Sequence, residues 1–309
     1  MPLTPQEALK IPAAGGKARA LAQLMDAGFT VPAWLVVPPD SEVPDSLAEM
    51  IVARVGPGPY AVRSSAIGED GAAHSFAGQF SSFLNVPAAE VVTRIAAVRA
   101  SAGNAHLASY LAASGAEHAV PAAIVQQMIE PRAAGVAFSA DAVGGRRSVA
   151  LVSAVPGLGE ALVSGEANAD TWEVDSVDAV RLGARGDAPV LCLGEDEVRA
   201  VAALARRCEI HFGRPQDIEW AIDGHGQLWL LQSRPITTLG QVPDPDDMLR
   251  VWDNSNIVES YGGVTTPLTF SFARKAYEHV YREFCRMLGV SVVGMARGED
   301  VFPRMLGLI

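Results

Sequence analysis

Residues 217–235 decide much of the fold, and they read DIEWAIDGHGQLWLLQSRP. Two runs rich in apolar and β-branched residues flank the turn residues Asp223-Gly224-His225-Gly226. A glycine-containing turn between two such runs is typical of a β-hairpin. The sequence therefore predicts two antiparallel strands, at residues 217–222 and 227–233.

The register of this hairpin brings four polar side chains together. A loop centred on the turn places Glu219 opposite Gln232 and Asp217 opposite Arg234, and alternation puts all four on one face. Directly paired residues have Cβ atoms about 4.5–5.5 Å apart. The oxygens of Glu219 and Gln232 can therefore share a hard cation such as Mg²⁺. Arg234 can add a two-pronged donor for phosphate oxygens.

The same pattern has a simpler reading as an exposed polar face. Charged hairpin faces are common, and an Asp217–Arg234 salt bridge there would stabilise the protein little. A register shift of one residue would also turn these side chains to the other face. The hairpin residues alone leave these alternatives open.

A second polar segment surrounds Arg63, which leaves a predicted strand at residues 60–64 beside two serines. A long loop rich in Gly, Ser and Ala follows, up to Gly78. Backbone N–H groups and hydroxyls in such a loop can donate to phosphate at little steric cost. A surface loop with a solvated arginine is the alternative.

Two glycine segments match nucleotide-binding motifs only in part. Gly15-Gly16-Lys17 lacks the earlier glycine and the following Ser or Thr of a Walker A motif. A lysine at the start of the helix predicted over residues 17–27 can still meet a phosphate. Gly157-Leu158-Gly159 lacks the third glycine of the dinucleotide pattern, because residue 162 is Leu, so a turn after a buried strand is the alternative.

Composition narrows the class of protein. The chain has 309 residues, 49% of them hydrophobic, and a formal net charge of −11, which argues against nucleic acid as a partner. No apolar run approaches the roughly 20 residues of a membrane helix, and the N-terminus does not resemble a signal peptide. Three widely spaced cysteines and six scattered histidines form no metal or nucleophile motif. A cytoplasmic protein without a membrane partner is expected.

The remaining pattern mixes helices and antiparallel strands, which favours an α+β fold over a doubly wound sheet. The acidic, proline-containing residues 241–247 indicate a linker. Helices are predicted at residues 17–27, 45–55, 88–113, 195–212 and 268–288, and further strands at 29–37, 60–64, 122–129, 135–139 and 147–154.

Seven motifs follow one another along the chain: Gly15-Gly16-Lys17, Val62-Arg63-Ser64-Ser65-Ala66, Ser75-Phe76-Ala77-Gly78-Gln79, Val125-Gln126-Gln127-Met128-Ile129, Gly157-Leu158-Gly159-Glu160, Asp217-Ile218-Glu219-Trp220 and Leu231-Gln232-Ser233-Arg234-Pro235-Ile236. Together they resemble the nucleotide-binding domain shared by phosphoenolpyruvate synthase, pyruvate phosphate dikinase and rifampicin phosphotransferase. The resemblance implies an ATP-grasp fold, in which two α+β lobes close on Mg-ATP. The expected division is a first lobe at residues 1–120, a second at 121–240, and a linker with the start of a truncated helical domain at 241–309.

The resemblance also implies roles for residues of the first lobe. Lys17 and Arg63 would hold phosphates, and Gly78 and Ser82 would lie in the loop that covers them.

In the second lobe, Gln126 or Gln127 would lie on the strand that lines the adenine pocket, and the motif itself favours Gln126. Glu219 and Gln232 would bind Mg²⁺, and Arg234 would contact the transferring phosphates.

The family's chemistry makes Arg63 and Arg234 the implied catalytic residues, because phosphoryl transfer depends on positioning and charge neutralisation. ATP would donate its β-phosphate to a histidine on a mobile domain, and that histidine would serve pyruvate or, in the antibiotic-modifying branch, a rifamycin hydroxyl.

Three departures limit the resemblance. The chain between Lys17 and Arg63 is shorter than is typical, and Asn168-Ala169-Asp170 lacks the usual proline. No Gly-rich segment with a Ser-His acceptor follows. The first hypothesis is therefore the ATP-using half of a phosphoenolpyruvate synthase-like enzyme that needs a histidine-bearing partner domain. The alternatives are a rifampicin phosphotransferase-like ATP domain and a non-catalytic ATP-binding module.

Overall fold

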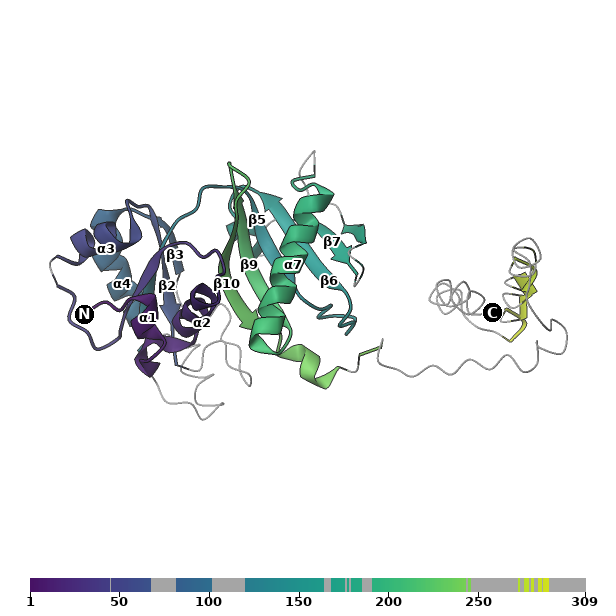
Figure 1. Ribbon diagram of the computed structural model, residues 1–309, viewed down its shortest axis with the longest axis horizontal. Helices are drawn as coiled ribbons and strands as arrows, with labels where there is room; N and C mark the ends of the chain where they lie inside the picture. Colours follow the sequence, from purple (N-terminus) through teal and green to yellow (C-terminus); the bar gives the residue numbers. More distant parts are fainter. Residues whose placement is uncertain are drawn as a thin grey trace. The chain divides into compact units, whose positions relative to one another are not determined.

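The computed structural model describes most of the first 245 residues and scattered positions between 272 and 288. The described ranges are 1–44, 46–67, 82–101, 120–163, 168–175, 177, 179–184, 191–242 and 244–245. The motif that contains Gly78 lies outside them. The chain divides into two compact units, Met1–Asp247 and Met248–Ile309. Both sheets belong to the first unit (Figure 1).

The first sheet has four antiparallel strands in the order β1-β4-β2-β3. Their bounds are β1 Trp34–Val37, β4 Ala122–Gln127, β2 Tyr60–Ser65 and β3 Ser82–Val86. Helices α3 (Leu47–Val55) and α4 (Val91–Ala100) bury apolar side chains against one face. Helices α1 (Pro5–Ala8) and α2 (Gly15–Asp26) pack on the other face. The sheet therefore lies between two helical layers.

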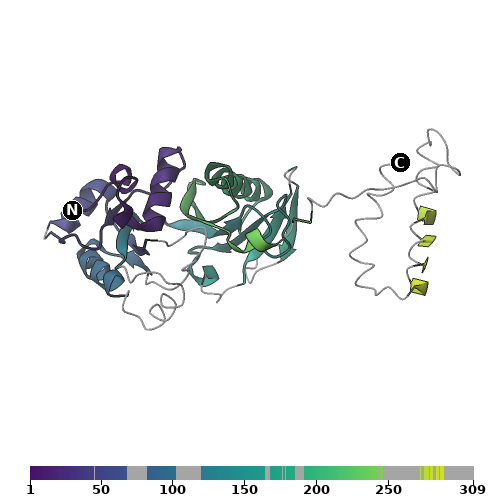
Figure 2. The same cartoon turned by 90° about the horizontal axis from the view of Figure 1, so that it is seen from below.

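The second sheet has six antiparallel strands in the order β10-β9-β5-β6-β7-β8. Their bounds are β5 Pro131–Phe138, β6 Ala150–Pro156, β7 Asp170–Val174, β8 Val180–Ala184, β9 Gln216–Asp223 and β10 Leu228–Pro235. The long helix α7 (Glu195–Phe212) packs its apolar stripe on one face of this sheet. Figure 2 shows the two sheets and their helices side by side as two lobes. The predicted α+β class is confirmed.

The two lobes share one buried core. Apolar side chains of α1 and α2 belong to the same cluster as those beneath α7. The backbone N–H of Leu230 in β10 donates to the carbonyl oxygen of Thr30 at 2.9 Å, which joins the edge of the second sheet to the segment before β1. These contacts hold the open edge of β10 against the first lobe.

Several predicted boundaries are wrong. The strand expected at residues 29–37 begins only at Trp34, and the one expected at 147–154 is β6, Ala150–Pro156. Of the helices expected over 88–113, the structure describes a 3₁₀ turn, Ala88–Glu90, and α4, which ends at Ala100; residues 102–113 lie outside the described residues. Strand β4, which we expected in the second lobe, pairs with β1 and β2 of the first sheet. Strands β3, β7 and β8 have no counterpart among the predicted elements.

The chain that leaves β10 is fastened to the second lobe by Arg147. Its Nη2 donates to the carbonyl oxygens of Leu239 at 2.7 Å and Val242 at 2.8 Å. Its backbone N–H lies 3.5 Å from an Asp244 carboxylate oxygen. The side chain of Leu239, in the short 3₁₀ helix Thr238–Gln241, is buried. The first residues after the last strand are thus held at a defined place.

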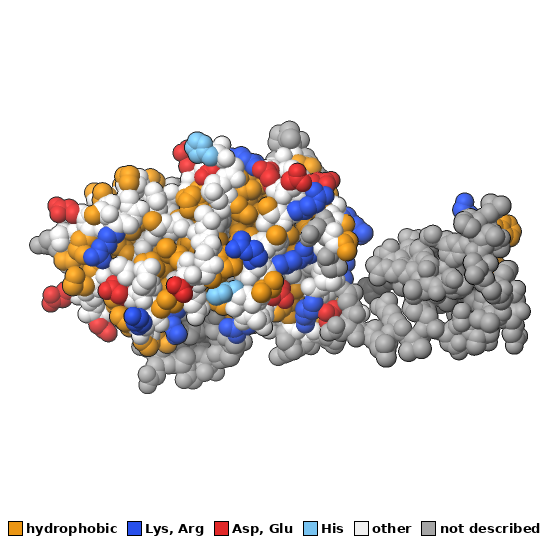
Figure 3. Space-filling view, in the orientation of Figure 1, with side chains coloured by type: hydrophobic (Ala, Val, Ile, Leu, Met, Phe, Trp, Pro, Cys, Tyr) orange, Lys and Arg blue, Asp and Glu red, His pale blue; other side chains and the backbone are white. Residues whose placement is uncertain are grey.

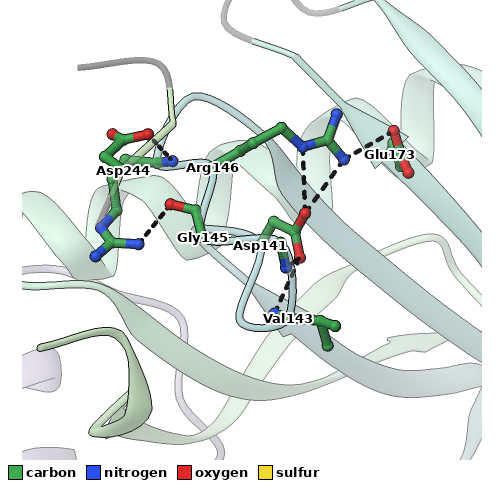
Figure 4. A network of polar contacts seen from close by, with 8 residues as sticks. Asp141, Val143, Gly145, Arg146, Glu173 and Asp244 are labelled. Carbon is green, nitrogen blue, oxygen red and sulfur yellow. Dashed lines mark hydrogen bonds and ion pairs between the residues drawn. The ribbon is translucent and has the colours of Figure 1, made fainter. Parts of the chain in front are cut away.

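The loop that presents Arg147 is itself held by Asp141 (Figure 4). The Asp141 carboxylate accepts from the backbone N–H groups of Val143 and Gly144 at 3.0 and 2.8 Å, and from the Arg146 guanidinium at 3.2 Å. Arg146 also forms an ion pair with Glu173 of β7 at 3.3 Å. This side-chain network fixes the turn between β5 and β6.

The surface of the described residues carries charges of both signs, and acidic and basic side chains are interspersed over the face shown in Figure 3. Among the helices that the structure describes, we find none with both the length and the apolar character needed to cross a bilayer.

Candidate functional site

In the hairpin of β9 and β10, the polar residues pair across the two strands as predicted. Glu219 lies opposite Gln232, and Asp217 lies opposite Arg234. A bulge between Leu230 and Gln232 shifts the register nearer the turn. The bulge lets Leu230 stay in the core while Gln232 projects from the opposite face.

The simpler reading of this hairpin as an exposed polar face is wrong. Gln232 and Asp217 are each only 7% exposed. The other face of β9 carries Ile218 and Trp220, which pack in the core beneath α7. The polar face of the hairpin is therefore turned toward the first lobe instead of toward open solvent, as its contact with Arg63 shows.

Arg63 reaches this hairpin from the first sheet. Its Nη1 donates to a Glu219 carboxylate oxygen at 3.0 Å and to the Gln232 amide oxygen at 3.4 Å. The side chains of Arg63 and Glu219 are 15% and 24% exposed, so the ion pair is largely shielded from water. One arginine of β2 thus contacts both side chains predicted to bind a cation.

Arg234 is held by Asp217 at the same face. Its Nε and Nη2 both lie 2.7 Å from one Asp217 carboxylate oxygen. Burial raises the pKa of Asp217, and the Glu219 charge adds to this, while Arg234 only partly offsets them. The ionised carboxylate of Asp217 is therefore unfavourable in this buried position unless the charge of Arg234 balances it.

Glu219 lies among positive charges. Burial opposes its ionisation, but the charges of Arg63, Lys17 and Arg234 outweigh burial, and the pKa of Glu219 falls below its ordinary value. Lys17 comes from the first turn of α2, Arg63 from β2 and Arg234 from β10. Three separate elements therefore bring cations to one ionised carboxylate.

Gln126 projects from the same face of the first sheet as Arg63. In antiparallel pairing, Gln126 lies opposite Ala61 and Ile124 lies opposite Arg63, and directly paired residues share a face. Gln126 is 2% exposed, and among the described residues its Nε2 has no hydrogen-bond partner. Gln127 projects from the opposite face of β4. The geometry therefore favours Gln126 over Gln127 as a donor in the site.

Ser82 also lies beside Arg63. It is the first residue of β3 and pairs directly with Arg63, although its own side chain is exposed. Gly78, which the resemblance places in the same loop, lies outside the described residues.

Other candidates from the sequence lie elsewhere. Asp170 is buried in β7 and accepts from the backbone N–H of Cys192 at 3.3 Å, which is a structural role within the second lobe. Gly157 has a φ of 71° and donates its N–H to the Arg132 carbonyl oxygen, as a turn after a strand requires. Within the described ranges, no group of three or more His, Cys, Asp and Glu side chains could hold a metal ion.

Two residues at the site, Asp217 and Ser65, make contacts that the sequence does not predict in full. Asp217 appeared in the sequence only as a salt-bridge partner, although its place opposite Arg234 was predicted. Ser65 is expected from the sequence only as one of the serines that could donate to phosphate; in the structure its Oγ accepts a hydrogen bond from the backbone N–H of Ala18 at 3.0 Å, next to Lys17. No periodicity in the sequence reports such a contact between a strand end and a distant helix.

Comparison with known proteins gives one family. The chain matches the family described as pyruvate phosphate dikinase, AMP/ATP-binding domain, over residues 38–186 and 176–250. A rifampicin phosphotransferase from Streptomyces sp is 39% identical over 68% of this chain and 28% of its own length. The phosphoenolpyruvate synthase of Pyrococcus furiosus is 33% identical over 65% of this chain and 29% of its own length.

A third relative extends further along the chain. The prodigiosin synthesizing transferase PigC of Serratia marcescens is 29% identical over 91% of this chain and 39% of its own length. This chain therefore spans between about a quarter and two fifths of the curated relatives that it matches.

Similarity to solved structures is weak. The D-alanine-D-alanine ligase from Coxiella burnetii gives a TM-score of 0.40 at 8% identity, over 74% of this chain and 49% of that one. The D-cycloserine synthetase DcsG gives 0.38 at 17% identity, over 76% and 67%. These values carry no argument about function. The family match, by contrast, covers more than half of the sequence, and by it the chain belongs to the pyruvate phosphate dikinase AMP/ATP-binding domain family.

Proposed function

We propose that this chain is a Mg-ATP-binding phosphotransferase module, the ATP-using half of a phosphoenolpyruvate synthase-like enzyme. In this proposal ATP transfers its β-phosphate to a histidine on a partner domain, with AMP and phosphate as the other products, and the phosphohistidine then passes its phosphate to pyruvate to give phosphoenolpyruvate. The observation that carries the proposal is the group of three cations around the Glu219–Gln232 pair. A polyanion with a bound divalent cation is the ligand that this arrangement suits.

The metal part of the proposal rests on the donor set. Mg²⁺ binds through one or two protein oxygens together with substrate phosphates and waters. The carboxylate of Glu219 and the amide oxygen of Gln232 supply two oxygens on directly paired residues. Mg²⁺ bound there would neutralise phosphate charge during transfer.

The phosphate part rests on Lys17, Arg63 and Arg234. In the structure Arg63 donates to Glu219, so the two charges balance each other across the lobes. Phosphate oxygens would give Arg63 an alternative anion, while a cation would replace it at Glu219. Arg63 and Arg234 would then neutralise the charge that spreads over the transferred group. Gly78 would lie in the loop that covers the phosphates, and Ser82, at the start of β3, would stand where that loop ends.

Asp217 has a positioning role in this proposal. Because Arg234 binds Asp217 through two nitrogens, its guanidinium is held before any ligand arrives. A donor fixed in advance loses less conformational entropy on binding. The unpartnered Nε2 of Gln126 supplies a further donor, which we assign to the adenine ring.

Two alternative functions differ from this proposal, the first in the final acceptor of the phosphate and the second in having no phosphate transfer. Rifampicin phosphotransferases among the relatives favour a rifamycin hydroxyl as the second acceptor class. A non-catalytic ATP-binding module is the other alternative, in which the same cluster binds nucleotide without turnover. A cytoplasmic location, and a partner domain that carries the histidine, belong to the proposal as well.

Phosphate transfer tests this function directly. The purified chain is mixed with Mg-[β-³²P]ATP and an isolated histidine-bearing domain from a phosphoenolpyruvate synthase or a rifampicin phosphotransferase. We expect acid-labile, base-stable label on that domain, and much less label with Glu219→Gln. Glu195→Gln is the matched control, because it removes an exposed ion pair with Arg199 in the first turn of α7. Tight ATP binding without any label on either domain would favour the non-catalytic module.

A further inference from the structure

The first turn of α2 is fastened to the end of β2, and this junction determines where Lys17 lies. We propose that Ser65 is a positioning residue that places Lys17 beside Arg63. The proposal rests on the proposed function, because it assigns Ser65 an effect on Mg-ATP binding through Lys17. Ser65 itself contacts no ligand in this account.

The residues on both sides of Lys17 are bound to the strand end. The backbone N–H of Ala18 donates to Ser65 Oγ at 3.0 Å, and the backbone N–H of Gly16 donates to the Ala66 carbonyl oxygen at 2.9 Å. Ala18 is fully buried and Ser65 is 1% exposed, so water does not compete for the first of these bonds.

Gly15 makes the close approach possible. Its φ is +83°, a conformation that glycine adopts without strain. A Cβ at this position would lie 2.2 Å from the Ser65 carbonyl oxygen and 2.4 Å from its Oγ. The helix can therefore start against β2 only with glycine here. The first glycine of Gly15-Gly16-Lys17 thus serves the contact between helix and strand.

The same contacts occupy two of the backbone amides at the N-terminus of α2. Amides at the start of a helix can bind phosphate, but those of Gly16 and Ala18 already donate within the protein. The contribution of this turn to an anion site therefore comes through the Lys17 side chain. Lys17 directly precedes Ala18, which is bound to the strand that carries Arg63.

The spacing of the two cations follows from this junction. Arg63 and Ser65 belong to the same strand and share one face, two residues apart. Ser65 ties Ala18 to that strand, so Lys17 and Arg63 are placed relative to each other by β2 itself. The short segment between Lys17 and Arg63 is therefore not what fixes their relative position.

The chain offers a matched control one residue away. Ser64 is also 1% exposed, but it projects from the opposite face of β2, and its Oγ has no hydrogen-bond partner in the part of the chain that the structure describes. Ser64→Ala and Ser65→Ala therefore remove the same atom from the same strand at the same burial. They differ in whether the hydroxyl holds the helix.

The experiment measures the Kd of Mg-ATP by calorimetry and amide hydrogen exchange of residues 15–20 in the full chain. We expect Ser65→Ala to weaken binding about tenfold, as for a buried N–H left without its acceptor. Exchange at Ala18 should rise in the same variant. Ser64→Ala should match the wild type in both. Ser65→Cys, which keeps a weaker acceptor, should fall between them and carries the test if Ser65→Ala does not fold.

A double variant distinguishes positioning from general loosening. In a Lys17→Met background, Ser65→Ala should change the Kd by less than twofold, since the charge that it positions is gone. Equal binding by Ser65→Ala and Ser64→Ala overturns the proposal. An undiminished Ser65→Ala effect in the Lys17→Met background overturns it too. A wild type that binds no Mg-ATP refutes the proposed function instead, while the exchange contrast at Ala18 still tests the contact.

Discussion

At the scale of single residues, the candidate site depends on two pairs of side chains in one hairpin and on Arg63 from the other sheet. Turn position and strand alternation place Asp217 opposite Arg234 and Glu219 opposite Gln232, because both are local properties of a hairpin. Arg63 lies in another sheet, and local periodicity does not report which distant element a strand will face. The family motifs supplied that link.

The Asp217–Arg234 pair gives an asymmetric prediction. Arg234→Ala leaves a buried carboxylate without its partner and should cost roughly 3–5 kcal/mol of unfolding free energy. Asp217→Asn should cost less than about 1 kcal/mol, because burial already disfavours the charged form. Urea unfolding of both variants and of the double variant checks this.

The pH dependence of Arg234→Ala follows from the same charge. The pKa of Asp217 is already raised in the folded protein, and losing Arg234 raises it further. The folded state then binds more protons than the unfolded state, so this variant should regain stability as the pH falls toward the ordinary Asp value of about 3.9. Equal stability of Arg234→Ala and Asp217→Asn at neutral pH would contradict this account.

Gly135 lies where any side chain would clash with the neighbouring strand of the second sheet. A Cβ at this position of β5 would lie 1.9 Å from the Ser153 carbonyl oxygen in the neighbouring strand. Gly135→Ala should therefore lower the free energy of unfolding by about 1–3 kcal/mol or more. Gly224→Ala in the hairpin turn is the control, because nothing lies within 4 Å of its added Cβ. The claim fails if the two variants unfold at the same denaturant concentration.

At the scale of elements, strong periodicity gave correct boundaries. Helix α7 begins after Gly194 and ends before Gly213, whose φ of 67° suits a helix C-terminus, and both ends match the prediction. Strand β7 was missed because Asp170 occupies a buried position and interrupts the apolar alternation with Trp172 and Val174. The edge strand β8 alternates apolar residues with Arg181 and Gly183, but it is only five residues long and largely exposed, which makes it a weak signal in the sequence.

The loop between β5 and β6 gives a prediction about pH. Burial opposes ionisation of Asp141, but the N–H groups of Gly144 and Val143 and the Arg146 guanidinium outweigh it, and the pKa of Asp141 is lowered. Its stabilising effect is therefore present above the ordinary Asp pKa of about 3.9 and is lost as the pH falls through the lowered value.

Asp141→Asn should reduce the free energy of unfolding by about 1–3 kcal/mol at pH 7, since two backbone N–H groups lose a charged acceptor. The gap from the wild type should narrow below about pH 4. Urea unfolding of both proteins between pH 3 and pH 7 checks this. A gap that stays constant down to pH 3 would show that the carboxylate charge is not the cause.

At the scale of the whole molecule, the sequence indicated one nucleotide-binding unit and more chain beyond it. The first compact unit, Met1–Asp247, contains every described residue of the candidate site. The division expected near residue 120 disagrees with the sheets, because β4 follows that residue and pairs with β1 and β2 of the first sheet. The shared core of α2 and β10 could not be predicted, since it depends on the packing of one lobe against the other.

The attachment of the following segment gives a prediction at this scale. Arg147→Ala removes two hydrogen bonds to the carbonyl oxygens of Leu239 and Val242. We expect amide hydrogen exchange of residues 237–245 to become at least several-fold faster, while the Kd of Mg-ATP stays within twofold. Arg181→Ala on the exposed edge strand is the control. Unchanged exchange in Arg147→Ala would show that other contacts hold the segment.

In the proposed function, the three cations Lys17, Arg63 and Arg234 and the Glu219–Gln232 pair form one Mg-ATP site. Calorimetric titration of the wild-type chain and of Glu219→Gln with ATP, in excess Mg²⁺ and in EDTA, tests it most directly. We predict that Mg²⁺ tightens ATP binding to the wild type at least tenfold, and that Glu219→Gln loses most of this gain. Wild-type binding that is the same with and without Mg²⁺, or an unchanged Mg²⁺ gain in Glu219→Gln, would contradict the account.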